Sequence, residues 1–137
     1  MKVYLDSCIV IYLIEGNPQN RTVVEAALQA HQPTTTLVSD LVRLECRVGP
    51  LRRNDHAMLE RFDNFFASAF VAPLNSAVYD LAAELRAQHR LKTPDALHAA
   101  AAILHGCDEF WTNDLRLGGL GSRLTLRVIP EPTSQEP

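Results

Sequence analysis

Two aspartates close predicted strands in this sequence, at Asp6 and Asp114. Asp6 ends the apolar run "KVYLD" (2–6), and Asp114 ends "EFWTND" (109–114). In an open α/β sheet, ligands bind at the carboxyl ends of the strands. The two carboxylates are therefore expected to point into one crevice if their strands are neighbours. Aspartate also favours turns and helix caps, so the strand ends alone leave a purely structural role open.

Glu45 is unusual because of the helix face that it occupies. Leu41, Val42 and Val48 are its neighbours at i−4, i−3 and i+3 on the predicted helix 39–49, so Glu45 lies in the apolar stripe. An inward-facing carboxylate is costly unless it is paired or bound to a metal. A buried arginine–glutamate ion pair is the structural alternative.

Asp95 opens the segment "KTPDALHAAAAILHG" (92–106), which is otherwise almost wholly apolar. Thr93 is a predicted N-cap and Pro94 suits the first helical position. The helix dipole alone would favour Asp95 in the first turn. The alanines that follow predict close packing against the sheet, so Asp95 is expected at the rim of a buried helix. His98 either contacts substrate or makes a structural hydrogen bond, and we prefer the structural role.

The four carboxylates are thus expected to converge at one end of the sheet. Without cations they would repel one another, and one or more pKa values would rise. Oxygen ligands without histidine or cysteine suit Mg²⁺ or Mn²⁺ better than zinc. A metal-held water can attack phosphorus while the metal stabilises the leaving oxygen. The pattern therefore predicts a divalent-metal site at which a water molecule can attack a phosphate group.

The elements that position these residues alternate between strand and helix. The predicted strands are 2–6, 34–38, 70–74, 109–114 and 124–129, and the predicted helices are 7–16, 21–31, 39–49, 54–68, 76–89 and 92–106. This alternation indicates an α/β domain with a mostly parallel sheet between helical layers. Residues 1–130 are expected to form one domain and 131–137 a disordered tail. The glycine-rich stretch 118–122 is interpreted as a turn, because it lacks the spacing of a phosphate-binding motif.

Composition narrows the class of protein. The 137 residues carry a net charge of −3 and are 47% hydrophobic, which is typical of a globular domain without a strong basic field. Three cysteines without a C-x-x-C pair argue against a disulfide framework or a zinc ribbon and favour a reducing cytoplasm. The N-terminal apolar run is broken by Asp6, which argues against both a signal peptide and a membrane span.

With these motifs in order, the sequence resembles the PIN-domain family and, within it, the VapC toxins of toxin–antitoxin pairs. The stretches that carry the resemblance are "VYLDSCIVIYLIEG", "VSDLVRLEC", "LKTPDALHAAAAI" and "FWTND". The resemblance implies a three-layer α/β/α fold and an Mg²⁺- or Mn²⁺-dependent endoribonuclease. The acidic positions of the family match Asp6, Glu45, Asp95 and Asp114, and its supporting polar positions match Ser7, Thr112 and Asn113. A threonine often follows the first aspartate, and here Ser7 keeps the hydroxyl.

The resemblance also implies partners. These are an RNA substrate, a second copy of the chain in a homodimer, and a cognate antitoxin protein whose C-terminal segment covers the site, all in the cytoplasm. The apolar helix 54–68, interpreted first as a core stripe, is a candidate groove for an amphipathic antitoxin helix. Candidates for a phosphate-binding rim along the RNA are Arg21, Arg52, Arg53, Arg86, Arg90 and Lys92.

Four alternatives remain open from the residues. The chain is a stand-alone PIN nuclease, a non-catalytic RNA-binding or protein-binding PIN domain, a nuclease acting on DNA, or a phosphatase or receiver domain phosphorylated on Asp6. Retention of all four acids argues against a decayed, non-catalytic domain. Haloacid-dehalogenase phosphatases need a second aspartate two positions after the first, where this chain has Cys8.

Overall fold

Five parallel strands form the central sheet of the protein. The computed structural model describes residues 1–16 and 18–129, and the side chain of residue 122 is outside that description. The strands are β1 (Lys2–Leu5), β2 (Thr35–Ser39), β3 (Phe70–Ala72), β4 (Glu109–Thr112) and β5 (Thr125–Val128), in the order β3-β2-β1-β4-β5. Every pairing is parallel, so the predicted α/β class with a mostly parallel sheet is confirmed. The predicted tail 131–137, with residue 130, lies outside the described residues.

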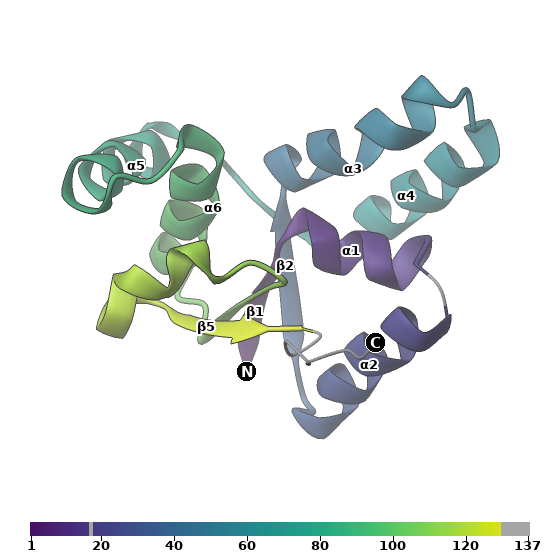
Figure 1. Ribbon diagram of the computed structural model, residues 1–137, viewed down its shortest axis with the longest axis horizontal. Coiled ribbons are helices and arrows are strands. Elements are labelled where there is room, and N and C mark those ends of the chain that lie inside the picture. The colour runs from purple at the N-terminus through teal and green to yellow at the C-terminus, as the bar shows by residue number, and fades with distance from the viewer. Residues whose placement is uncertain (17, 130–137) are drawn as a thin grey trace, which may run out of the picture.

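Helices cover both faces of this sheet, as Figure 1 shows. They are α1 (Ser7–Ile14), α2 (Pro18–Ala30), α3 (Asp40–Arg52), α4 (His56–Ser68), α5 (Ser76–His89) and α6 (Thr93–Leu104), with a 3₁₀ segment, η1 (Leu115–Arg123), before β5. The chain steps outward from β1 to β2 to β3 through α1–α4, and then crosses back to β4 and β5. Because parallel crossovers are right-handed, this reversal places α5 and α6 on the face opposite to α1–α4. The predicted three-layer α/β/α architecture is confirmed.

The core explains why α6 is so rich in alanine. Ala99, Ala100 and Ala102 have no exposed surface, since small side chains let the helix lie close to the strands. Tyr4 of β1 stacks on Phe110 of β4, with ring centroids 5.2 Å apart. The innermost strands therefore present large rings, and the helix above them contributes mostly methyl groups.

Several predicted helix boundaries were wrong. The helix expected to stop at residues 49–50 runs on to Arg52 with Pro50 inside it; Pro50 is buried, and its packing outweighs the hydrogen bond that a proline cannot donate. The predicted cap Thr93 is the first helical residue, and Lys92 occupies the N-cap. The stretch 118–122, expected to be a turn, lies within η1, which is interrupted by the positive φ of Gly121.

Two structural findings concern the predictions about a membrane span and about disulfides. In the part of the chain that the structure describes, no helix combines the length and apolar character needed to cross a membrane. Cys8, Cys46 and Cys107 are all free thiols, and Cys46 is buried.

Candidate metal centre

Asp6 is held at the junction of β1 and α1 by two hydrogen bonds. It is the N-cap of α1, and its Oδ1 accepts the backbone N–H of Ser7 at 2.7 Å. Its Oδ2 accepts the hydroxyl of Thr112, at the end of β4, also at 2.7 Å. Each oxygen keeps a further lone pair, because a carboxylate oxygen accepts about two hydrogen bonds. Asp6 is therefore fixed in orientation and still has free ligand capacity.

Glu45 is held from the opposite side of the sheet by His98. Glu45 lies on α3, and its Oε1 is 2.9 Å from His98 Nε2 on α6. His98 is 3% exposed, and its Nδ1 is 2.8 Å from the hydroxyl of Tyr4, which in turn lies 2.8 Å from Ser39 Oγ. Ser39 caps α3 by accepting the N–H of Val42. A buried chain of hydrogen bonds thus joins the capped end of α3 to the carboxylate that α3 carries.

Glu45 is therefore paired with His98 and not with a buried arginine, which was the structural alternative. The hydrogen-bond network also supports the hydrogen-bonding role that was preferred for His98. Burial and the nearby Asp6 and Glu45 carboxylates raise the pKa of the Tyr4 hydroxyl, although its bond to Ser39 opposes the shift, so Tyr4 stays protonated. The side chain of Tyr4 therefore acts as a neutral spacer between Ser39 and His98.

Asp95 and Asp114 share one guanidinium, that of Arg116. Arg116 Nε donates to Asp114 Oδ2 at 2.5 Å, and its Nη1 lies 3.7 Å from Asp95 Oδ2. The backbone N–H of Arg116 donates to Asp114 Oδ1 at 2.9 Å. Burial raises the pKa of the Asp95 carboxyl; Arg116 and His98 oppose this rise, and Asp114 and Asp6 reinforce it. Repulsion between the acids was expected to raise a pKa; at Asp95 burial is the main cause of the rise, and the neighbouring acids add to it.

The four carboxylates do not form one uniform cluster. Ligand atoms of Asp6, Glu45 and His98 lie within 4.8 Å of one another, whereas Asp95 and Asp114 are joined through Arg116. Thr112 links the two groups, since its hydroxyl donates to Asp6 and accepts the N–H of Asp114 at 3.2 Å. The four side chains are between 21% and 36% exposed, so a hydrated ion can reach them from solvent.

The donor set fits a divalent cation, with one departure from what the sequence predicted. The oxygens of Asp6 and Glu45, with those of Asp95 and Asp114 beside them, suit Mg²⁺ or Mn²⁺. However, the tight group contains an imidazole, whereas the sequence predicted oxygen ligands alone. Both ring nitrogens of His98 already have hydrogen-bond partners. The residues therefore fit a metal held mainly by carboxylates, with His98 orienting Glu45 from behind.

The three supporting polar residues take different positions. Thr112 is 1% exposed and contacts Asp6 directly. Ser7 contributes its backbone N–H to Asp6. Asn113 faces α1 instead, where its Nδ2 donates to the Tyr12 hydroxyl at 3.0 Å and its backbone N–H donates to Cys8 Sγ at 3.3 Å. Thr112 and Ser7 thus orient the carboxylate, whereas Asn113 fastens the end of β4 to α1.

Cys8 occupies the position at which a haloacid-dehalogenase phosphatase would need its second aspartate. Burial and the neighbouring Asp6 raise the pKa of its thiol to about 11, so the group is neutral at pH 7. A neutral thiol cannot supply the charge or the proton transfer of that carboxylate. The local chemistry therefore disfavours the phosphatase alternative.

The predicted basic rim divides into two sets. Arg90 and Lys92 line a cavity together with Asp95 and Arg116, and Arg86 supports that segment by donating to the Leu91 carbonyl at 2.9 Å. The others lie elsewhere. Arg21 donates to the Ile14 carbonyl at the far end of α1, Arg53 pairs with Glu15, and Arg52 is exposed at the end of α3. Only the first set lies beside the carboxylates.

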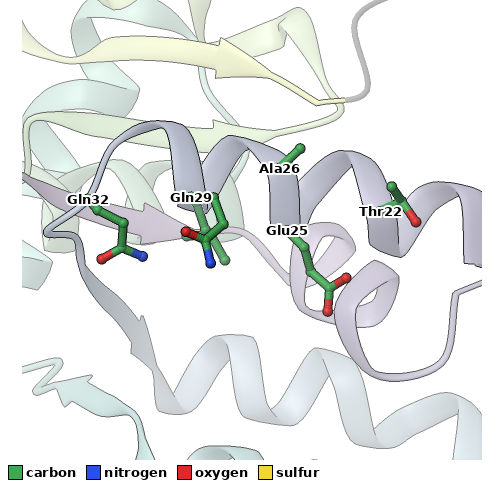
Figure 2. A pocket seen from close by; sticks show the side chains of 6 residues that line it. Thr22, Glu25, Ala26, Gln29 and Gln32 are labelled. Carbon is green, nitrogen blue, oxygen red and sulfur yellow. The ribbon is translucent and has the colours of Figure 1, made fainter.

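A larger surface cavity, of about 580 Å³, lies along α2 and the turn that follows it (Figure 2). Its lining residues are Thr22, Glu25, Ala26, Leu28, Gln29 and Gln32. Glu25 is the one charged side chain among these six. No acidic residue of the candidate metal centre lies on this helix, so the cavity has no evident part in its chemistry.

Sequence reasoning missed two features of the centre. Arg116 was not singled out, although its position two residues after Asp114 is a signal for a local ion pair. Tyr4 was assigned only to a buried strand, and no pattern in the sequence marks its hydroxyl as a partner of both Ser39 and His98, because those residues are 35 and 94 positions away.

Comparison with known proteins agrees with this fold. The family model described as "PIN domain" matches residues 3–121, and the chain belongs to the PIN-domain family. A search of curated protein sequences found no match. Solved structures with a similar fold share only low sequence identity with the chain.

Three of these structures are VapBC2, a toxin–antitoxin complex and the toxin VapC20. The chain is similar to VapBC2 from Rickettsia felis, bound to a DNA fragment from its promoter, with a TM-score of 0.78, 19% identity, and coverage of 93% of this chain and 98% of that one. The chain is also similar to a toxin–antitoxin complex from Klebsiella pneumoniae, with a TM-score of 0.72 and 23% identity. The match covers 87% of this chain and 92% of that one. It is similar as well to Mycobacterium tuberculosis VapC20, a sarcin-ricin loop cleaving toxin, with a TM-score of 0.72 and 18% identity. That match covers 87% of this chain and 95% of the other.

Proposed function

We propose that this chain is a Mg²⁺- or Mn²⁺-dependent endoribonuclease that acts as the toxin of a toxin–antitoxin pair. The observation that carries the proposal is the delivery of four carboxylates, by four different elements, to the carboxyl edge of a PIN-domain sheet. Asp6 comes from the end of β1 and Asp114 follows β4, while Glu45 and Asp95 lie on helices from opposite faces. Membership of the PIN-domain family supports the same reaction class.

The residues that would hold the cation are Asp6, Glu45, Asp95 and Asp114. A bound Mg²⁺ or Mn²⁺ would supply a lowered pKa for a water molecule and positive charge beside the phosphate oxygens. The chain itself contributes orientation. Thr112 and the N–H of Ser7 fix both oxygens of Asp6, and His98 fixes Glu45. Because these contacts are in place before substrate arrives, the carboxylates need little reorganisation when the phosphate binds.

RNA is the proposed substrate because the sequence resembles the VapC toxins, and that resemblance implies a ribonuclease activity. The basic residues beside the site, Arg90 and Lys92, suit a phosphate backbone rather than a particular base. VapC20, which shares the fold, cleaves the sarcin-ricin loop. We extend only the general class, cleavage of RNA, to this chain.

The proposed partners are an antitoxin and a second copy of the chain. Folds seen in toxin–antitoxin complexes support the antitoxin. Along α4, Leu59, Phe62 and Phe66 are buried as predicted. On neighbouring α3, however, Leu44 and Leu51 are 58% and 53% exposed. Exposed leucines beside a packed helix pair suit an amphipathic partner helix.

The experiment that tests the nuclease is cleavage of total RNA by the purified protein, with the cleavage sites mapped. Wild-type protein should cut in Mg²⁺ or Mn²⁺ and not in excess EDTA, and Asp6→Asn or Glu45→Gln should not cut. The same variants should remain folded by circular dichroism, because each removes a charge from a crowded group. Full activity in Asp6→Asn, or activity that survives chelation, would contradict the assignment.

A separate experiment tests the toxin role. Expression of the chain should arrest growth, and co-expression of the neighbouring gene should restore it. If the neighbouring product neither binds the purified chain nor slows its RNA cleavage, the toxin–antitoxin role is wrong. A stand-alone PIN nuclease would then be the remaining interpretation.

A further inference from the structure

Arg116 is the charged residue of the site to which the proposed reaction gives no role. It lies at the start of η1, is 56% exposed, and contacts both Asp114 and Asp95. Its hydrogen bond with Asp114 raises the pKa of its guanidinium further, so the group is always charged. Two of the four proposed metal-binding carboxylates therefore already share one positive charge that belongs to the chain.

A divalent ion and this guanidinium need the same oxygens. Arg116 uses Asp114 Oδ1 through its backbone N–H, Asp114 Oδ2 through Nε, and approaches Asp95 Oδ2 through Nη1. A metal held by Asp95 and Asp114 would compete with the side-chain contacts and would repel the positive guanidinium. Exposed ion pairs contribute only modestly to stability, so this pair is weak enough for a divalent ion to displace.

A basic cavity lies next to the ion pair. It measures about 240 Å³ and is lined by His89, Arg90, Leu91, Lys92, Asp95 and Arg116. We call it the Arg90–Lys92 cavity. Arg90, Lys92 and Arg116 give it three fixed positive charges against the single carboxylate of Asp95. If Asp95 is engaged by a metal, the cavity carries an uncompensated positive charge, which favours an anion.

The wall of the Arg90–Lys92 cavity is an ordered turn. Arg90 has a left-handed backbone, with φ 57° and ψ 35°, a conformation that is unfavourable for a residue other than glycine. Its N–H donates to the Arg86 carbonyl at 2.9 Å, and Arg86 Nε donates to the Leu91 carbonyl, also at 2.9 Å. Leu91 is buried. These contacts hold an arginine where a glycine would be less strained, and they place it in the same cavity wall as Arg116.

We propose that Arg116 links metal binding to RNA binding. When a divalent cation binds Asp95 and Asp114, the Arg116 guanidinium leaves them and turns toward the Arg90–Lys92 cavity. There it binds a backbone phosphate of the RNA strand, together with Arg90 and Lys92. This inference rests on the proposed ribonuclease function and adds a phosphate subsite to it. Because the guanidinium serves one site or the other, metal and RNA should strengthen each other's binding.

The test measures both ligands without relying on cleavage. Mn²⁺ affinity is measured by calorimetry. RNA affinity is measured by fluorescence anisotropy with a labelled single-stranded oligoribonucleotide in Ca²⁺, and gels verify that the RNA stays intact. Arg116→Gln should bind Mn²⁺ roughly twofold to fivefold more tightly, because its competitor is gone. The same variant should bind the RNA roughly tenfold more weakly, because a charge-assisted phosphate contact is lost.

Three further variants separate this mechanism from a general loss of positive charge. Arg90→Gln should weaken RNA binding and leave Mn²⁺ affinity within about twofold, since Arg90 lines the cavity and does not hold the acids as Arg116 does. Arg123→Gln, at the exposed far end of η1, should change neither affinity. Arg116→Lys keeps the charge without the planar fork and should recover part of the RNA affinity.

The results that would contradict the linkage differ from the result that would contradict the nuclease proposal. If Arg116→Gln behaves like Arg123→Gln in both titrations, or loses affinity for both ligands, the linkage is wrong. If Ca²⁺ strengthens RNA binding equally in wild type and in Arg116→Gln, the linkage is also wrong. The nuclease proposal fails by a different result, the absence of RNA cleavage by the wild-type protein, which the two binding titrations do not involve.

Discussion

At the scale of single residues, the centre is organised by partners rather than by the acids themselves. Asp6 is held by a hydroxyl and a backbone N–H and Glu45 by an imidazole, whereas Asp95 and Asp114 are held by a guanidinium. The two groups therefore respond differently to substitution. Removing a partner of Asp6 or Glu45 leaves a carboxylate poorly oriented, while removing one of the paired acids relieves crowding and frees Arg116.

Asp95→Asn is expected to abolish RNA cleavage and to stabilise the fold at neutral pH. The pKa of Asp95 is raised in the folded state, mainly by burial, so the folded protein holds this proton more tightly than the unfolded chain does. Below the unfolded pKa both states are protonated and the carboxyl has no effect. As the pH rises through the folded pKa, the cost of ionising it is fully expressed.

The melting temperature of Asp95→Asn should therefore exceed that of wild type by roughly 1–3 °C at pH 7.5. The difference should shrink as the pH approaches about 4. Asp80→Asn, on the exposed face of α5, provides the control and should show no such pH-dependent difference. A lower melting temperature for Asp95→Asn at both pH values would show that the contact with Arg116 outweighs burial.

Tyr4→Phe tests the buried network behind Glu45. The substitution keeps the ring that stacks on Phe110 and removes the hydroxyl that lies between Ser39 and His98. Each of those groups then loses a partner in a buried position, so the free energy of unfolding should fall by about 1–3 kcal/mol. Chemical denaturation measures this. Tyr79→Phe, 53% exposed on α5, should change stability by less than about 0.5 kcal/mol.

At the scale of elements, the order of strands and helices could be predicted because each has its own local signal. The apolar runs predicted β1 and β4, and the helical spacing in 54–68 predicted α4, whose stripe residues Leu59, Phe62 and Phe66 are buried. Boundaries were less accurate where tertiary packing decides. Pro50 continues a helix because it is buried, and η1 forms in a glycine-rich stretch in which Leu117 and Leu120 are buried.

The site was predictable to a similar degree and for a similar reason. The placement of Asp6 and Asp114 follows from local strand ends, and that of Asp95 from a helix start. Their partners depend on contacts between distant segments: His98 with Glu45 spans 53 residues, and Thr112 with Asp6 spans 106. A single sequence holds no periodic signal for such contacts, so the division of the acids between His98 and Arg116 required the structure.

Helix α6 should be intolerant of larger side chains. Ala100 has no exposed surface, and its methyl group lies in a layer that is already close-packed. Ala100→Leu should therefore lower the free energy of unfolding by about 1–3 kcal/mol through overpacking. Ala83→Leu, on an exposed face of α5, adds the same side chain in solvent and should stay within about 0.5 kcal/mol of wild type. Equal effects of the two substitutions would mean that α6 has room to shift away from the sheet.

At the scale of the whole molecule, the reversal in strand order explains why the centre lies where it does. The chain leaves β1 toward β2 and later continues from β4 toward β5, so the connections diverge between β1 and β4. A crevice forms at such a switch point, outside the carboxyl ends of the strands. Asp6 and Thr112 meet across it, and helices from both faces reach it. The fold thus gathers acids from four elements without any of them being close in sequence.

Gathering these acids has a cost for the whole fold, and a divalent cation should offset it. A ligand that binds only the folded protein adds about 2.7 kcal/mol to stability when its concentration is about 100 times its dissociation constant. Mn²⁺ or Mg²⁺ should therefore raise the melting temperature of the wild-type protein in a concentration-dependent way, and EDTA should reverse the rise. Asp6→Asn should show little or no rise, because it removes a ligand that Thr112 and Ser7 hold in place.

Potassium chloride at matched ionic strength is the control for screening of the repulsion among the carboxylates. Screening alone would stabilise wild type and the variant by more similar amounts. If the salt control reproduces the whole shift, or if Asp6→Asn gains as much as wild type, the cation does not bind at this centre.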